Sequence, residues 1–240
     1  MIDLVYLYTA GSNTNEIRYS LRSFQKHVSG IGKVFIVGDD PGIFKDVTII
    51  PMGNIHGFNQ ARNIYEKILA ACRQPEVSDP FICASDDYIL LHDYNAAELP
   101  FYCYGTFKEP LQWLAHDSKY RAYVTVTNDA LLEKQLPTKF FNVHFPILYD
   151  KQKYIEVMAL YDWDRPKSFI SKSLYANTLR IEGEPTEREK KFHHSKTIAA
   201  IRRQLIGCKY FSTSDDAMNE PMIEFLNEIL PDAHPCEKKI

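Results

Sequence analysis

Two adjacent acidic residues, Asp86 and Asp87, follow the apolar stretch FICAS at residues 81–85, and a second apolar stretch, YILL, comes directly after them. The first stretch predicts a buried strand that ends at Ser85. Two carboxylates at the end of a core strand repel each other and lose hydration, so they need a compensating partner. A divalent cation with oxygen ligands would neutralise both acids and would act as a Lewis acid on a phosphate leaving group. The structural alternative is a capped turn, with Asp86 accepting backbone N–H bonds and Asp87 solvated.

The first hundred residues predict a sheet that could hold these acids at its edge. Strands that alternate with single helices indicate a mostly parallel α/β sheet, and ligands of such sheets gather outside the carboxyl ends of the strands. The acids follow the fourth predicted strand. The predicted strands are 2–8, 33–38, 46–51 and 81–85, and the predicted helices begin near Thr14 and at Asn59.

The spacing of apolar residues predicts which face of each helix is buried. Asn13 and Glu16 have the spacing of a capping box at the start of the first helix. The inward residues are expected to be Ile17, Leu21, Phe24 and Val28 in the first helix, and Ile64, Ile68 and Ala71 in the second, which runs to Cys72.

The second half of the chain reads as a less regular α+β arrangement. The alternating stretch YRAYVTVT predicts a strand at 120–127, and NDALLEKQ predicts a short helix capped by Asn128 or Asp129. KFFNVHFP at 139–146 resembles a further strand, and the charged stretch 182–194 is expected to be a loop. Helices are expected within 150–161, 195–205 and 220–230. Because no repeat or linker interrupts the chain, we expect one domain over 1–240.

Composition narrows the class of protein. The chain has 240 residues, a net charge of −3 and 45% hydrophobic residues, which is typical of a globular domain and not of a wholly basic nucleic-acid binder. No apolar run is long enough to span a membrane. The five cysteines form no CxxC pair, which favours a reducing cytoplasm over a disulfide framework or a zinc cluster.

The acidic motif Ser85-Asp86-Asp87, at the end of a strand in a βα-alternating half, resembles the metal-binding acidic motif of GT-A-type glycosyltransferases. In this family the motif is usually Asp-x-Asp, so Ser85 replaces the first acid. The stretch RYSLRSFQKHVSGIGKVFIVGDDP is similar to bacterial and phage glycosyltransferase-like proteins and to the stealth-type sugar-phosphate transferases. The resemblance implies a GT-A-like, Rossmann-like domain, with a nucleotide-sugar-binding half at 1–100 and an acceptor-binding half at 101–240.

The resemblance also implies roles for residues of the first half. It implies that Asp87 is a metal ligand. It implies that Asp86 contacts the sugar or ribose and is a catalytic residue. Each further candidate has a structural explanation as well: a core ring, a solvated helix face or a turn. These candidates for binding the nucleotide-sugar are Tyr8 and Thr9 at the base, Arg18 and Arg62 at the phosphates, and Asp39 at the ribose or base.

Three candidates come from the second half. His144 would be a further metal ligand or a buried structural histidine. Lys196, after His193 and His194, would close over the diphosphate or lie in a solvated loop. Asp129 would be the general base for the acceptor hydroxyl, at a strand-to-helix junction, or a helix N-cap without chemistry.

The function expected from these residues is a metal-dependent glycosyltransferase. It would use Mn²⁺ or Mg²⁺ and a nucleoside-diphosphate sugar, with a UDP-sugar favoured, and would transfer the sugar to a glycan or to a hydroxymethylated base in phage DNA. A stealth-like sugar-phosphate transferase and a non-catalytic nucleotide-binding module are the alternatives.

Overall fold

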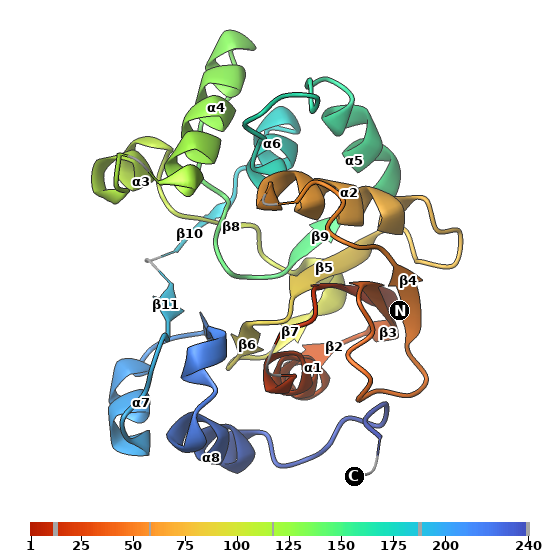
Figure 1. The fold of residues 1–240 in the computed structure, drawn as a ribbon, viewed down its shortest axis with the longest axis vertical. Coiled ribbons are helices and arrows are strands. Elements are labelled where there is room, and N and C mark those ends of the chain that lie inside the picture. Colours follow the sequence, from red (N-terminus) through yellow and green to blue (C-terminus); the bar gives the residue numbers. More distant parts are fainter. Residues whose placement is uncertain (12–13, 58, 117, 187–188, 239–240) are drawn as a thin grey trace.

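The computed structural model describes residues 1–240 except 12–13, 58, 117, 187–188 and 239–240. Its centre is a five-stranded sheet with the order β4-β3-β1-β5-β9 (Figure 1). The first four of these strands are parallel, and β9 pairs with β5 in the antiparallel direction. The strands are β1 (Ile2–Tyr8), β3 (Ile31–Gly38), β4 (Thr48–Pro51), β5 (Phe81–Ser85) and β9 (Ile147–Tyr149).

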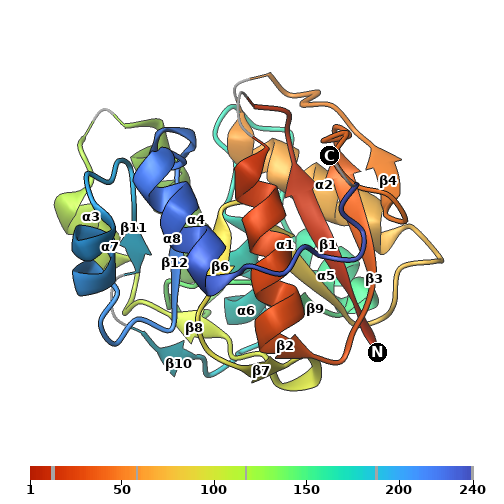
Figure 2. The same cartoon turned by 90° about the horizontal axis from the view of Figure 1, so that it is seen from below.

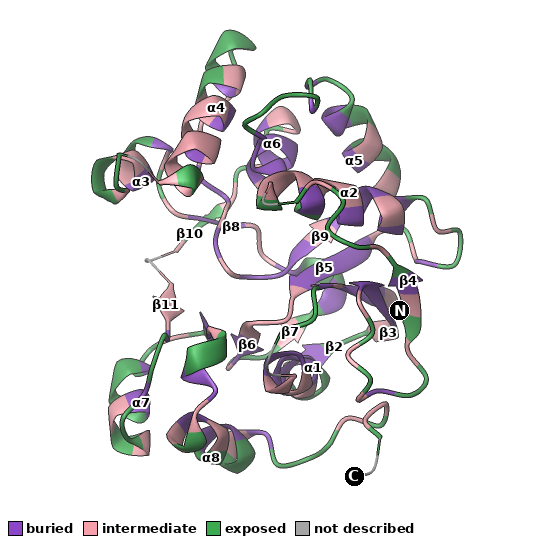
Figure 3. Ribbon diagram, in the orientation of Figure 1, coloured by how far each residue is buried: buried purple, intermediate pink, exposed green. Residues whose placement is uncertain are grey.

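Helices cover both faces of this sheet, which explains why its strands are apolar at successive positions. Helix α1 (Asn15–His27) packs Ile17, Leu21 and Phe24 on the face that contains Leu4 and Tyr6. Helix α2 (Gln60–Cys72) packs Ile68 and Ala71 on the opposite face, against Val5, Phe35 and Val37. The sheet is accordingly the most deeply buried part of the molecule (Figure 3).

The strand order reverses between β1 and β5. Leaving aside the two-residue strand β2, the four parallel strands have the spatial order third-second-first-fourth, which is compatible with a Rossmann-like sheet. The chain moves from β1 toward one edge of the sheet and then crosses to β5 on the other side of β1. At such a reversal the connections leave in opposite directions, and the carboxyl ends of the two strands bound the usual ligand crevice.

Further helices lie on the two sides of the sheet. Helices α4, α5 and α6 pack with α2 or with one another on one side, whereas α7 and α8 pack together beside α1 (Figures 1 and 2). The bounds are α3 (Lys108–Trp113), α4 (Lys119–Glu133), α5 (Lys151–Met158), α6 (Ser171–Thr178), α7 (Ile198–Gln204) and α8 (Glu220–Ile229).

Short strands connect the second half to the first. A three-stranded sheet with the order β11-β12-β6 brings residues of the second half next to β6, which directly follows β5. It consists of β6 (Tyr88–Leu90), β11 (Lys190–Lys191) and β12 (Tyr210–Ser212). Two further pairs are β2 (Val28–Ser29) with β7 (Tyr94–Asn95), and β8 (Tyr102–Cys103) with β10 (Glu184–Pro185). Short 3₁₀ turns lie at Ala96–Glu98 and Asp215–Ala217.

The predicted first half is confirmed with small shifts of boundary. Helices α1 and α2 begin at Asn15 and Gln60, and the proposed cap at Asn13 lies outside the described residues. The inward position predicted for Ile64 is wrong, because its side chain is 37% exposed. Among the described residues, no helix combines the length and the apolar character that crossing a membrane requires.

The strand predicted at 120–127 is wrong, and so is the separate helix after it. Residues 120–133 of the two stretches belong to the single helix α4, whose N-cap Ser118 accepts a 3.0 Å hydrogen bond from the Arg121 N–H group. Val124, Thr127 and Leu131 are its buried residues, at the spacing of one helix face. Tertiary burial and the cap therefore outweigh the β-propensity of the valines and threonines.

The strand predicted at 139–146 is also wrong, since no named strand occurs there. Residue 139 forms an isolated bridge to Thr106, and the segment then runs to β9 without regular pairing. The ammonium group of Lys172 instead donates hydrogen bonds to the carbonyl oxygens of Val143 and Phe145. The charged stretch 182–194, expected to be a loop, contains the two-residue strands β10 and β11.

Candidate functional site

Four acidic side chains gather at the carboxyl end of β5. Asp86 and Asp87 form the two-residue turn between β5 and β6, and both are half-buried. Glu16, in the first turn of α1, is buried with 7% of its surface exposed, and Asp215 lies in the 3₁₀ turn after β12. The charges of Asp87 and Asp215 both act on Asp86 and on Glu16. The edge of the sheet is therefore strongly acidic.

The pairing of β12 with β6 holds these acidic residues near one another. The Thr213 N–H group donates to the carbonyl oxygen of Asp87 at 3.2 Å, and the Thr213 hydroxyl donates to Glu16 Oε1 at 2.7 Å. A Cβ atom at Gly11 would lie 3.5 Å from Asp215 Oδ2. Residues of the first and last parts of the chain thus meet at one edge of the sheet.

Burial and mutual repulsion disfavour ionisation of two of these acids. Burial is the largest cause that raises the pKa of Asp86 to about 7, and the charge of Asp87 adds to it. Burial also raises the pKa of Glu16 to about 7, although the hydrogen bond from Thr213 opposes this shift. Around neutral pH this site contains carboxyl groups that a bound cation would help to ionise.

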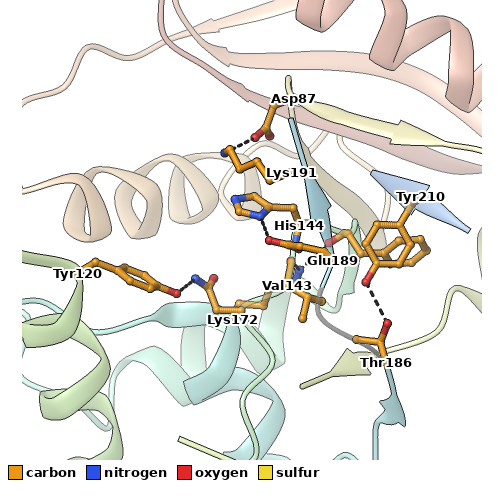
Figure 4. A network of polar contacts seen from close by, with 11 residues as sticks. Asp87, Tyr120, Val143, His144, Lys172, Thr186, Glu189, Lys191 and Tyr210 are labelled. Carbon is orange, nitrogen blue, oxygen red and sulfur yellow. Dashed lines mark hydrogen bonds and ion pairs between the residues drawn. The ribbon is translucent and has the colours of Figure 1, made fainter. Parts of the chain in front are cut away.

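Lys191 is the cation paired with this cluster. Its ammonium group lies 3.3 Å from Asp87 Oδ2, and the two side chains are 31% and 15% exposed (Figure 4). Among the described residues, no other cationic side chain forms an ion pair with Asp86, Asp87, Glu16 or Asp215.

A second lysine lies at the exit of β1. Lys67, on α2, is buried with 4% exposure and donates at 2.7 Å to both the carbonyl oxygen of Tyr8 and the hydroxyl of Thr9. Burial lowers the pKa of Lys67, while the charges of Asp39 and Asp86 oppose the shift. Asp39 Oδ2 in turn accepts a 2.7 Å hydrogen bond from the N–H group of Ala10. These bonds hold the backbone of the loop after β1.

Gly38 permits the close approach of β1 and β3 at this edge. It has a φ of 135°, and a Cβ atom there would lie 1.8 Å from the carbonyl oxygen of Tyr8 and 3.2 Å from Lys67 Nζ. Only glycine fits that backbone conformation and that contact.

A second group of polar contacts surrounds His144. The carboxylate of Glu189 accepts from the His144 N–H group and pairs with its ring Nδ1 (Figure 4). Lys172 fixes the backbone on both sides of His144, with Nζ distances of 2.8 Å to the Val143 oxygen and 2.5 Å to the Phe145 oxygen. Burial lowers the pKa of Lys172 to about 8. The His144 ring lies edge-on to Tyr88, which follows Asp87 in the chain.

The carboxylate oxygens at this edge are ligands of the type that a hard divalent cation prefers, but too few of those described lie close together to complete its coordination. Mg²⁺ and Mn²⁺ are such cations. Among the described residues, however, no three His, Cys, Asp or Glu side chains lie close enough together to hold a metal ion. His144 therefore does not join Asp86 and Asp87 in such a group. A cation held by one or two carboxylates completes its coordination with water and substrate phosphates, which is the usual pattern for Mg²⁺.

The structure brings together some of the predicted site residues. Tyr8, Thr9, Asp39, Asp86 and Asp87 all lie at the carboxyl ends of β1, β3 and β5. The Tyr8 ring belongs to the core, with 2% exposure, as the structural explanation anticipated. Thr9 and Asp39 hold the loop after β1 through hydrogen bonds.

The two predicted phosphate-binding arginines pair with acids. Arg18 Nε lies 4.0 Å from Glu237 Oε2, against the C-terminal segment, where Arg22 forms the closer pair. Arg62 Nη2 lies 2.6 Å from Asp164 Oδ1.

Two predicted residues of the second half lie in exposed positions. Lys196 is exposed in the segment before α7. Asp129 was expected at a strand-to-helix junction, but this position is wrong, because Asp129 lies within α4 and is exposed there. Its carboxylate is 3.5 Å from the amide nitrogen of Asn128.

Several residues of the site were missed from the sequence. Lys67 interrupts the apolar face that contains Ile68 and Ala71, and this anomaly was the available signal. Glu16 was read only as a capping residue. Nothing in local spacing indicates that Glu189, Lys191 and Asp215 return to the exit of β5, because their positions depend on the β11-β12-β6 sheet.

Neither the protein-family models nor the curated proteins with which the chain was compared match it.

Proposed function

We propose that this protein is a metal-dependent glycosyltransferase that moves a sugar from a nucleoside-diphosphate sugar to an acceptor hydroxyl. The observation that carries the proposal is the Asp86-Asp87 turn at the carboxyl end of β5, beside the reversal of strand order. Burial and the charge of Asp87 raise the pKa of Asp86, so the ionised pair of acids is costly at this position unless a ligand helps to neutralise it. The resemblance of Ser85-Asp86-Asp87 to the GT-A motif supports the same assignment.

The proposal gives each acid a role. Asp87 would hold Mn²⁺ or Mg²⁺, and the bound cation would supply charge that stabilises the leaving diphosphate. The adjacent Asp86, whose pKa burial raises, would accept a hydrogen bond from a sugar or ribose hydroxyl. The loop after β1, held by Lys67 and Asp39, would form the wall of the nucleotide site. A UDP-sugar is the favoured donor.

The acceptor is a hydroxyl of a glycan or of a hydroxymethylated base in DNA. Arg202 and Arg203 are exposed on α7, and Arg202 pairs with Glu228. Binding of DNA through such residues would weaken steeply as the salt concentration rises. The compartment we propose is a reducing cytoplasm, because none of the five cysteines, all of which lie in the described part of the chain, forms a disulfide.

A thermal-stability panel tests the donor site. The protein is melted with UDP, other nucleoside diphosphates and their sugars, each with and without Mn²⁺. A ligand that binds only the folded state raises the melting temperature by mass action. We expect a shift that requires both the nucleotide and Mn²⁺, and we expect Asp87→Asn to abolish it. Asp93→Asn is the matched control, since Asp93 is 89% exposed and pairs with His27.

Turnover is tested with the donor that the panel identifies. Release of nucleoside diphosphate in the presence of an acceptor supports a glycosyltransferase, whereas release of nucleoside monophosphate indicates a sugar-phosphate transferase. The substitution of the first acid by Ser85 favours a second candidate, a binding module without catalysis. Metal-dependent nucleotide binding without any turnover would support that module. The absence of a shift with every nucleotide would contradict both functions.

A further inference from the structure

We infer that Lys191 is the resident counter-ion of Asp87 and that a divalent cation binds at Asp87 only by displacing it. This inference rests on the proposed function, because it assumes that Asp87 holds a cation. It adds a residue that sets the affinity of the site for that cation. The Lys191 ammonium group and a metal ion from solution would therefore compete for the Asp87 carboxylate.

The first observation is the position of the ammonium group. Lys191 Nζ lies 3.3 Å from Asp87 Oδ2, within reach of both an ion pair and a hydrogen bond. A metal ion bound to this oxygen would lie about 2 Å from it, so the ion and the ammonium group would be neighbouring positive charges in a half-buried place. Such neighbours repel each other, and the two cannot share Asp87 Oδ2 without a loss of affinity.

The second observation is that strand pairing holds the backbone of Lys191, whereas its side chain is 31% exposed. Strand β11 pairs with β12, with Lys190 opposite Phe211 and Lys191 opposite Ser212. The next residue, Phe192, is buried with 3% exposure, and its N–H group donates to the Ser212 oxygen at 2.9 Å. On the other side, Glu189 is held by His144. Displacement therefore needs a change of lysine rotamers and not the opening of the loop.

The third observation is that Lys190 provides a built-in comparison. Successive residues of a strand point to opposite sides, and Lys190 Nζ lies 5.8 Å from the centroid of the Phe192 ring. It has the same charge as Lys191 and lies one residue away, but it makes no ion pair with the four acids. Any difference between the two lysines therefore reports contact with Asp87 and not total charge.

Direct binding of Mn²⁺ tests the inference, with unbound Mn²⁺ measured by electron paramagnetic resonance. We expect Lys191→Met to tighten binding about threefold to fivefold, which is the range that a partly exposed ion pair is worth. Lys190→Met should change it much less. Asp87→Asn should abolish it. Equal effects of the two lysine variants, or no tightening in Lys191→Met, would overturn the inference and leave the proposed metal site standing.

A second measurement uses the reciprocity of the competition. If a cation displaces Lys191, saturating Mg²⁺ should speed acetylation of the Lys191 amine at least about twofold, because the amine loses its carboxylate partner. The rate at Lys190 should stay constant. Unchanged labelling of Lys191 at Mg²⁺ concentrations that occupy the site would overturn the displacement. If no variant, Lys191→Met included, binds Mn²⁺ through Asp87, the proposed metal site fails together with the inference.

Discussion

The ammonium group of Lys67 donates a 2.7 Å hydrogen bond to the carbonyl oxygen of Tyr8, at the point where β1 leaves the sheet. A second bond of the same length reaches the hydroxyl of Thr9. A helix on one face of the sheet thus holds the loop at the sheet edge. Because the lysine is buried, removing one of its acceptors should be measurable as a loss of stability.

A double-mutant cycle tests this contact. We expect Thr9→Val to lower the free energy of unfolding by about 0.5–1.5 kcal/mol in the native background, because a hydrogen bond at an exposed hydroxyl is lost. In the Lys67→Met background the same change should cost almost nothing. The difference between the two values is the coupling energy, measured by urea denaturation. Additive effects of the two substitutions would mean that the bond contributes no stability.

The pKa of Asp86 predicts a dependence of stability on pH. The carboxyl group titrates near pH 4 in the unfolded chain, whereas burial raises its pKa to about 7 in the folded protein. Between these values the folded protein binds more protons than the unfolded chain, so stability falls as the pH rises from about 4 to about 7. Asn cannot ionise, and Asp86→Asn removes this loss.

We therefore expect wild type and Asp86→Asn to have similar stability near pH 4, and the variant to be more stable at pH 8 by about 1–3 kcal/mol. Urea denaturation with a chelator present measures both values, and Asp93→Asn serves as the control. A difference between the variant and wild type that does not change with pH would show that Asp86 is not buried as described.

Gly38 predicts a large and local effect. Gly38→Ala places a Cβ atom 1.8 Å from the Tyr8 carbonyl oxygen, so β1 and β3 must separate. We expect a loss of more than about 3 kcal/mol, in the range of strongly destabilising substitutions. Gly42→Ala is the matched control: Gly42 also has a positive φ, of 73°, but nothing lies within 4 Å of its added Cβ. It should cost about 1 kcal/mol. Similar losses at both positions would contradict the close contact.

The pair of His144 and Glu189 predicts a dependence on pH of the opposite sign. Burial alone would raise the pKa of Glu189, but the hydrogen bonds and charge of His144, with the charge of Lys172, outweigh it and lower the pKa. The stability that the ionised carboxylate contributes is present above about pH 4.5 and is lost as the pH falls through the lowered value. Glu189→Gln should therefore lower stability by about 1–2 kcal/mol at pH 7, and by less at pH 3.5. Urea denaturation at the two pH values measures this, and an undiminished difference at pH 3.5 would contradict it.

The sequence predicts the first half of the fold well, because local and global preferences agree there. Strands β1 and β5 have apolar side chains on both faces, and α1 has a clear buried face of Ile17, Leu21 and Phe24. In α4 the two kinds of preference disagree. The alternation of Val124 and Val126 with threonines indicates a strand, but Ser118 caps a helix whose buried residues follow a helical spacing.

The candidate site was predicted only in the part that follows directly from strand ends. Asp86, Asp87 and Asp39 were found because the carboxyl ends of parallel strands meet at one edge. Lys191 was missed because its contact with Asp87 joins residues 104 positions apart, through a strand of two residues. Strands this short have too little periodicity to be recognised, and their pairing is set by tertiary contacts.

The turn of Asp86 and Asp87 also joins two separate sheets, since β5 belongs to the five-stranded sheet and β6 to the three-stranded one. The backbone of the two acids is therefore a direct covalent link between the sheets. A ligand that binds both carboxylates would restrain this link. We expect its binding to slow amide hydrogen exchange in β5 and in β12 at the same time.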